Sequence, residues 1–201
     1  MTEDNDQKKR IFFKALIEFD LYDTKNSIVE KNTMISRKNK FDYDELISCA
    51  KGELFGIGNP QLPMPPMLMI DRVTEISDDD GEHNKGHVIA EFDINPKLWF
   101  FDCHFEGDPV MPGCLGLDAL WQLTGFNLGW REMKGRGRAL GVGEVKFTGM
   151  VTPDIKLVRY EVNFTRVIDR KLKLGMANGT MYADNEKIYS AENMKVGLFQ
   201  S

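Results

Sequence analysis

An apolar stretch from Pro109 to Trp130 constrains the fold more than any other part of the sequence. It contains one formally charged side chain, Asp118. After a helix start at Gly113, large apolar side chains cover nearly every side of the helix: Leu115, Leu117, Leu120, Trp121, Leu123, Phe126, Leu128 and Trp130. A helix that is apolar on all sides is stable only when it is buried. Its ~17 residues span about 25 Å, which suits a core helix wrapped by other elements better than a membrane span.

The segments on both sides of this helix have the patterns of β-strands. Residues 67–76 and 87–94 predict a hairpin, joined by an acidic, glycine-containing turn at 77–86. After the helix, four segments are rich in β-branched and aromatic residues and are separated by turn signals: residues 139–151, 156–168, 172–183 and 187–198. The expected fold is therefore α+β, with antiparallel strands around one long helix at about residues 113–130.

Ahead of the hairpin, residues 43–50 predict a short helix. Asp42 is its expected N-cap, and Gly52 lies just beyond its expected end. The proline-rich residues 60–66 then predict an extended connector.

Composition and charge exclude several classes of protein. The chain of 201 residues has a net charge of −5, which is not the basic footprint of a nucleic-acid-binding protein. The longest uncharged stretch, residues 54–70, contains four prolines and cannot cross a bilayer as a regular helix. The first ten residues are polar with no signal-peptide core behind them, and three cysteines make no paired disulfide framework. We expect a cytoplasmic protein with no nucleic-acid or membrane partner.

The candidate chemistry lies around the start of the central helix. Desolvating an unpaired carboxylate costs several kcal/mol, so Asp118 must be paired, protonated or at a cavity. His104 lies in an aromatic-rich loop that leads into the same end of the helix. The free amides of Gly113 and Cys114 would favour developing negative charge at a helix N-terminus. A base, an acid and oxyanion donors would suit proton abstraction next to a thioester carbonyl, with no metal or redox cofactor.

The candidate residues also have interpretations in which they serve the structure and not catalysis. Asp118 could be satisfied by backbone amides or an arginine, and His104 could be an ordinary core histidine. A nucleophilic thiol at Cys103 is weaker, because neighbours in extended backbone point to opposite faces and a buried thiol is usually inert. His83 and His87 have a spacing that could bind zinc on a helix, but they fall in an acidic turn, where a solvated loop is the usual outcome.

The residues of this region resemble one family closely. The run CHFEGDPVMPGCLGLDALWQ at residues 103–122 is similar to the 3-hydroxydecanoyl-acyl-carrier-protein dehydratase/isomerase family of bacterial fatty-acid synthesis. The similarity continues in five further segments: residues 52–56, 68–72, 95–101, 135–149 and 195–200. It implies a single hot-dog dehydratase domain at residues 41–201. Residues 1–40 are then an N-terminal extension of unknown role.

The resemblance also implies a function for the site residues. It implies a homodimer with its active sites at the interface, in which His104 of one subunit faces Asp118 of the other and the Gly113 amide binds the thioester carbonyl. The expected reaction is dehydration of a (3R)-hydroxyacyl-acyl-carrier-protein of about ten carbons to the trans-2-enoyl thioester, followed by isomerisation to the cis-3-enoyl thioester. Asp rather than Glu at position 118 favours the bifunctional branch.

Three alternatives to this function stay open. They are a dehydratase without isomerase activity, a thioesterase on the same scaffold, and a non-catalytic acyl-thioester-binding hot-dog module. No cofactor is expected. The expected partner is acyl carrier protein, and the basic cluster of Arg166, Arg170 and Lys171 is the candidate docking surface for this acidic protein, although it could also be a solvated strand end.

Overall fold

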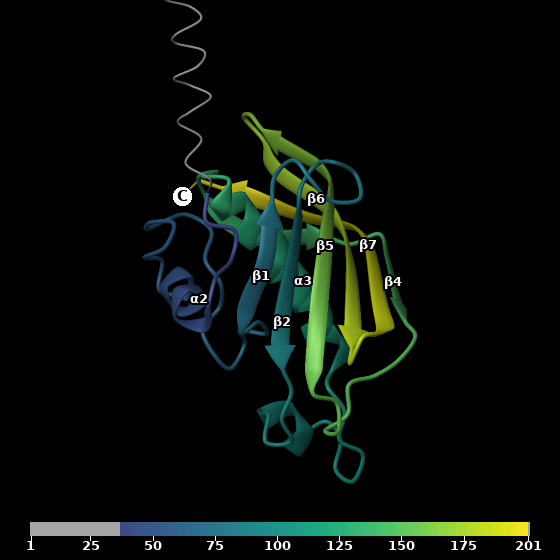
Figure 1. Cartoon of the computed structure of the whole chain (residues 1–201). Coiled ribbons are helices and arrows are strands. Elements are labelled where there is room, and N and C mark those ends of the chain that lie inside the picture. The colour runs from purple at the N-terminus through teal and green to yellow at the C-terminus, as the bar shows by residue number, and fades with distance from the viewer. Residues whose placement is uncertain (1–36, 201) are drawn as a thin grey trace, which may run out of the picture. The chain divides into compact units, whose positions relative to one another are not determined.

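The computed structural model describes residues 37–200 (Figure 1). The extension predicted at residues 1–40 lies almost entirely outside this range. Among residues 37–200, no helix is long and apolar enough to cross a membrane.

One antiparallel sheet of seven strands dominates the fold. The strand order is β1-β2-β5-β6-β7-β3, and β4 also pairs with β7. The strands are β1 (Arg72–Ser77), β2 (His87–Asp93), β3 (Arg136–Gly141), β4 (Glu144–Phe147), β5 (Leu157–Asp169), β6 (Lys173–Ala183) and β7 (Glu186–Phe199). The sheet curves around helix α3 (Gly113–Trp130), which contacts β2, β3, β5, β6 and β7 (Figure 1). This is the predicted hot-dog fold.

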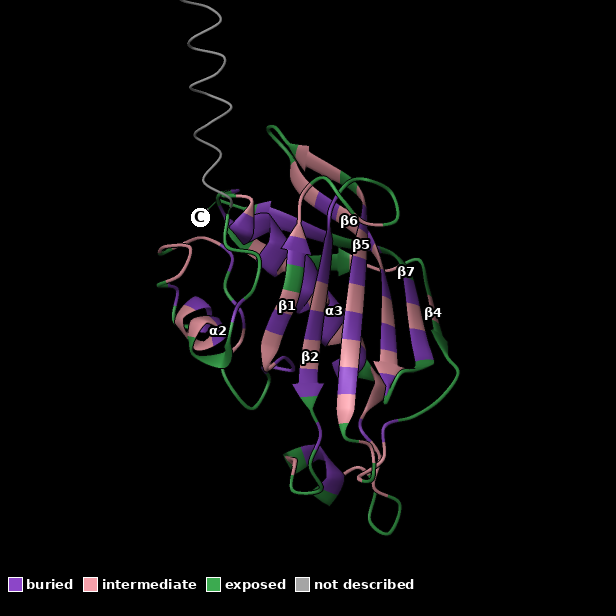
Figure 2. Cartoon of the chain, viewed as in Figure 1, coloured by how far each residue is buried: buried purple, intermediate pink, exposed green. Residues whose placement is uncertain are grey.

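The burial pattern explains why the strands wrap the helix. In β5, Val158, Tyr160, Val162 and Phe164 are fully buried, and the residues between them are only partly covered. This alternation places every second side chain against α3 (Figure 2). On α3, burial extends around most of the helix and includes Gln122, Thr124 and Asn127. The prediction of a buried central helix is therefore confirmed.

The short helix before the sheet also forms as predicted. Helix α2 (Tyr43–Ala50) begins after Asp42, whose side chain accepts a hydrogen bond from the Glu45 amide while the Glu45 carboxylate accepts one from the Asp42 amide. This reciprocal arrangement is a capping box. Gly52 follows the helix with a φ of 80°, a backbone conformation that glycine adopts without strain.

Two predicted strands have different bounds in the structure. The first begins at Arg72 rather than at residue 67, because the backbone of Met67 and Met69 bonds to the side chain of Gln122 instead of to a strand. The segment predicted at 139–151 is split into β3 and β4. Gly141, with a φ of 156°, ends β3, and the two strands pair with successive parts of β7.

Helix α3 is positioned at its start by the loop that follows β2. After Asp93 the chain forms a short 3-10 helix, η1 (Trp99–Asp102), in which Phe100 and Phe101 are buried. The chain then turns through residues 103–108 and returns along Val151, whose carbonyl accepts a hydrogen bond from the Met111 amide at 2.9 Å. This path brings His104 to the same end of the molecule as the start of α3.

Candidate active site

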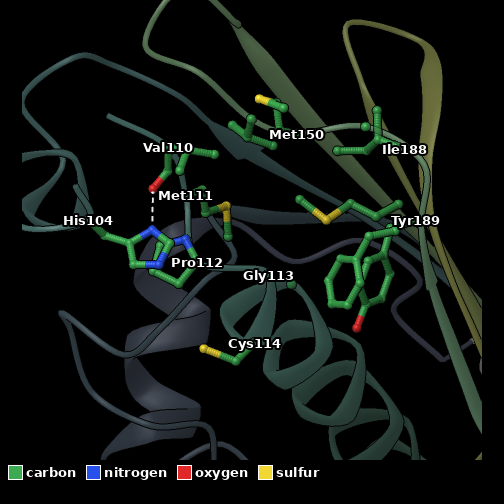
Figure 3. A pocket seen from close by; sticks show the side chains of 14 residues that line it. His104, Val110, Met111, Pro112, Gly113, Cys114, Met150, Ile188 and Tyr189 are labelled. Atoms are coloured by element: carbon green, nitrogen blue, oxygen red, sulfur yellow. Dashed lines mark hydrogen bonds between the residues drawn. The ribbon is translucent and has the colours of Figure 1, made fainter. Parts of the chain in front are cut away.

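His104 is held by the backbone of its own loop. Its ring Nδ1 lies 2.9 Å from the carbonyl oxygen of Val110 (Figure 3). A carbonyl oxygen only accepts hydrogen bonds, so Nδ1 carries the proton. The Val110 amide in turn donates to the His104 carbonyl at 2.8 Å, which closes the loop around the ring. In a neutral imidazole, Nε2 therefore has the free lone pair and can act as a base.

The first turn of α3 lies beside this imidazole (Figure 3). The helix begins after Pro112, which provides no side-chain cap, and the first amide to bond back is that of Leu115, to the Pro112 carbonyl at 3.0 Å. The amides of Gly113 and Cys114 therefore keep their donors for another partner. A Cβ added at position 113 would lie 2.3 Å from the ring of Phe147, so the ring packs on this helix start in its present position because residue 113 is glycine.

A cavity of about 320 Å³ joins these groups. His104, Gly113 and Cys114 line one part of it, and most of the remaining wall is apolar: Met111, Phe147, Met150, Val151, Met181 and Ile188. Its volume is at the lower end of the range typical of small-ligand pockets, about 300–1,000 Å³. The cavity therefore combines one base, helix-end donors and an apolar wall, as an acyl thioester requires.

Tyr189 adds a polar group that the sequence did not single out. It lines the cavity, and its buried hydroxyl has no hydrogen-bond partner among the described residues. Burial raises the pKa of this tyrosine to about 12, so its hydroxyl stays protonated at neutral pH. Its ring packs edge-on against Phe147, with the ring centres 4.8 Å apart.

Asp118 is half-buried on α3 but does not line this cavity. Its Oδ2 accepts a hydrogen bond from Nε2 of Gln122 at 2.6 Å. The partner is thus a side-chain amide one turn along the helix, rather than the backbone amides or arginine considered from the sequence. The structure brings His104, Gly113 and Cys114 together and leaves Asp118 outside their cavity.

Gln122 is a second residue of this region that sequence analysis missed. It is 8% exposed, and its amide is held on both sides: Nε2 also donates to the Met67 carbonyl at 2.9 Å, and Oε1 accepts from the Met69 amide at 3.3 Å. These bonds fix which atom of Gln122 faces Asp118. The available signal was a polar residue four positions after Asp118 on an otherwise apolar helix, a spacing that places two side chains together.

The candidate docking surface lies far from the His104 cavity. Arg166, Arg170 and Lys171 are exposed near the turn between β5 and β6. The opposite end of β5 starts at Leu157, which pairs with Asp93 just before the loop to η1. A 13-residue strand is about 40 Å long, and Figure 1 shows the turn between β5 and β6 at the opposite end of the sheet from the loop that follows β2.

The remaining sequence candidates do not join this site as catalytic groups. The thiol of Cys103 is exposed rather than buried, and it bonds back to the carbonyls of Trp99 and Phe100. His83 is exposed, whereas His87 is buried with its Nε2 3.0 Å from Oε1 of Glu75. The predicted solvated loop is therefore correct for His83 and wrong for His87.

Comparisons with known proteins identify the family of this chain and structures to which it is similar. A family model described as the FabA-like domain matches residues 62–192. Among solved structures, the dehydratase heterocomplex ApeI:P from Xenorhabdus doucetiae is 16% identical and has a TM-score of 0.53, with 69% of this chain and 87% of that chain covered. A sigma28-regulated virulence protein from Campylobacter jejuni is 8% identical, with 69% and 81% covered and a TM-score of 0.47. At such identities, the first likeness supports the fold alone.

Proposed function

This chain belongs to the FabA-like domain family, and from that premise we propose that it dehydrates a (3R)-hydroxyacyl thioester carried by acyl carrier protein. We further propose that the acyl chain has about ten carbons and that the enzyme isomerises its trans-2-enoyl product to the cis-3-enoyl thioester. The observation that carries the proposal is the His104 imidazole, which has its Nδ1 on the Val110 carbonyl and lines an apolar cavity at the start of α3.

In the proposed dehydration, each group at the cavity has one role. The thioester carbonyl accepts hydrogen bonds from the free amides of Gly113 and Cys114, which stabilise the negative charge that develops on its oxygen. Nε2 of His104 removes a proton from C2, and the C2–H electron pair forms the C2–C3 double bond. The C3–O bond breaks as the carboxyl group of Asp118 donates its proton, so the hydroxyl leaves as water. No redox step is required.

In the proposed isomerisation, the same groups move a proton along the chain. Nε2 of His104 takes a proton from C4 of the trans-2-enoyl thioester, and the double bond shifts to C3–C4. Asp118, or a water bound to it, returns a proton to C2. The product is the cis-3-enoyl thioester with the same atoms as the substrate.

The position of Asp118 outside its own subunit's cavity supports a site shared between two subunits. We propose a homodimer in which the partner subunit's Asp118 completes the cavity that contains His104. Strand β3 lies at one end of the strand order, so it has a free edge for pairing. Leu140, Phe147 and Met150 are each at least half exposed near this edge, as expected of a surface that a second copy covers.

The position of the basic cluster supports a proposal for carrier-protein docking. Arg166, Arg170 and Lys171 lie at the far end of β5 from the loop that contains His104, and we propose that a carrier protein bound there serves the cavity of the partner subunit. Replacing the three residues with glutamate is expected to raise KM and to flatten the salt dependence of kcat/KM. Unchanged kinetics would exclude this surface.

The test of the function is the product formed from a defined substrate. Purified full-length protein is incubated with (3R)-hydroxydecanoyl-acyl-carrier-protein, and the acyl groups are identified by mass spectrometry and gas chromatography. We expect both trans-2- and cis-3-decenoyl products, with activity lost in His104→Ala and Asp118→Asn while both variants remain folded dimers. Turnover retained in either variant would contradict the assignment.

The alternatives have their own products in this assay. The trans-2 product alone would indicate a dehydratase without isomerase activity, and free 3-hydroxydecanoic acid would indicate a thioesterase. Binding of the acyl carrier substrate without any turnover would indicate a non-catalytic acyl-thioester-binding module.

A further inference from the structure

A second cluster of ligand-type side chains lies at the other end of the sheet from His104. Glu75 of β1, Asp80 of the β1–β2 loop and His87 at the start of β2 each offer one donor atom, and these atoms all lie within 4.8 Å of one another. His87 begins β2, whereas the loop to His104 follows the end of that strand (Figure 1). The cluster is therefore separate from the proposed active site.

His87 is buried on the face of the sheet that points away from α3. Val88, Ala90 and Phe92 are the core-facing residues of β2, so the alternation of a strand turns His87 to the outer face. The β1–β2 loop covers it there, since a Cβ added at Gly81 would lie 2.9 Å from the Cβ of His87. The side chain of His87 is consequently 10% exposed.

The hydrogen bonding of His87 is incomplete. Nε2 lies 3.0 Å from Oε1 of Glu75, but the buried Nδ1 has no hydrogen-bond partner within residues 37–200. A buried polar atom without a partner is destabilising. His87 also lines a cavity of about 220 Å³ together with Glu161 and Asn163.

The spacing of the donors fits a transition-metal ion. Bonds of about 2.1 Å to nitrogen and oxygen place neighbouring ligands about 3.0 Å apart at 90° and about 3.4 Å apart at the tetrahedral angle that Zn²⁺ prefers. The separation of 3.0 Å between His87 Nε2 and Glu75 Oε1 lies within this range. All three donor atoms lie within 4.8 Å of one another, and the exposed Glu75 and Asp80 side chains have the freedom to bring the wider-spaced donors closer.

The local charge favours a cation. Between residues 75 and 87 the sequence has five acidic side chains, Glu75, Asp78, Asp79, Asp80 and Glu82, and one basic side chain, Lys85. Like charges this close repel one another, and a divalent cation relieves the repulsion.

The backbone of the β1–β2 loop is held in place at its end. The Gly86 amide donates to the Asp80 carbonyl at 2.7 Å, and Arg131, at the end of α3, donates to the Lys85 carbonyl at 2.6 Å. Asp80 is therefore presented to His87 on a loop anchored to the central helix.

We propose that Glu75, Asp80 and His87 bind a divalent transition-metal ion of the Zn²⁺ class, with water at its remaining positions. One imidazole and two carboxylates are a donor set for Zn²⁺ or Mn²⁺ rather than for Mg²⁺, which prefers oxygen ligands and keeps its waters. The ion would fix the β1–β2 loop on the outer face of the sheet. The site takes no part in the dehydration chemistry and does not depend on the proposed function.

The test is a titration of full-length, EDTA-treated protein with ZnCl₂ by isothermal titration calorimetry. We expect one binding event that Asp80→Asn weakens at least tenfold and that His87→Ala abolishes. His83→Ala is the matched control, because His83 is an exposed histidine of the same loop, and it should bind Zn²⁺ as the unmodified protein does. MgCl₂ should give no binding at the same concentrations.

The same set of variants distinguishes the proposed site from zinc binding by exposed cysteine thiols. An event carried by Cys103 or Cys114 would persist unchanged in Asp80→Asn and His87→Ala, and that result would overturn the proposal. Equal losses in His83→Ala and Asp80→Asn would also overturn it. If His87→Ala does not fold, Asp80→Asn and Glu75→Gln, which change exposed side chains, decide the outcome. Dehydratase activity should be the same with and without Zn²⁺. The zinc titration therefore tests the metal site, and the activity assay tests the proposed function independently of it.

Discussion

At the scale of single residues, the orientation of Asp118 depends on Gln122. The buried amide of Gln122 donates to Oδ2 of Asp118 and is itself held by the backbone of Met67 and Met69. A carboxyl group that must donate a proton to a leaving hydroxyl needs a defined position, and Gln122 provides it without touching the cavity residues. Gln122 is therefore a positioning residue in the proposed reaction.

We predict that Gln122→Met lowers kcat about 10- to 100-fold and leaves KM within about twofold, because the substrate still binds while the carboxyl group loses its orientation. The measurement is steady-state kinetics with hydroxydecanoyl-acyl-carrier-protein. Thr124→Val is the matched control, since Thr124 is also buried on α3 but bonds only to the Leu120 carbonyl of its own helix. An equal fall of kcat in both variants, or a change confined to KM, would contradict the positioning role.

At the scale of elements, α2 shows how a short helix is specified locally. Eight residues form few intrahelical bonds, so the capping box of Asp42 and Glu45 and the burial of Leu46 and Cys49 contribute much of its stability. Burial also raises the pKa of Cys49 to about 11, so this thiol stays protonated and unreactive.

We predict that Asp42→Ala destabilises α2 by about 1 kcal/mol, because the Glu45 amide loses its acceptor. The measurement is amide hydrogen exchange of α2 followed by mass spectrometry, in which protection of residues 46–50 should fall about fivefold. Asp44→Ala removes a carboxylate from the same turn without breaking the box and should have a smaller effect. Equal losses in the two variants would assign the effect to charge alone.

At the scale of the whole molecule, the proposed catalytic groups do not meet within one copy of the chain. His104 and the start of α3 line the cavity, and Asp118 of the same chain does not. In the proposed homodimer, a subunit that lacks His104 still provides Asp118 to its partner, and the reverse holds for a subunit that lacks Asp118.

We therefore predict that two inactive variants restore activity when they are mixed. In a dimer of His104→Ala with Asp118→Asn, one site has both substitutions and the other has neither. Random exchange at equal concentrations forms half of the dimers as hybrids, so activity should recover to about a quarter of the unmodified level. The measurement is dehydratase activity after dissociation and reassociation of the mixture, with each variant treated alone as the control. Activity that stays at the level of the separate variants would exclude a shared site.

Much of the fold follows from local patterns in the sequence. The bounds of α3, the capping of α2 and the β1–β2 hairpin agree with periodicity, capping residues and turn signals. These features depend on residues within one or two turns of each other, so the sequence alone contains the information. The division of residues 139–151 into two strands was not predicted, because Gly141 ends a strand only in relation to its pairing with β7.

The sequence by itself determined a buried central helix, the antiparallel strands around it and the candidate residues His104, Gly113, Cys114 and Asp118. Only the tertiary structure decided that Gln122 binds Asp118 while it holds a segment 53 residues away, and that His87, rather than His83, joins Glu75 and Asp80. The physical reason is that such contacts depend on strand register and on the path of loops. A shift of one residue in register moves every side chain of a strand to the other face, and the side chains that meet there come from segments far apart in the sequence.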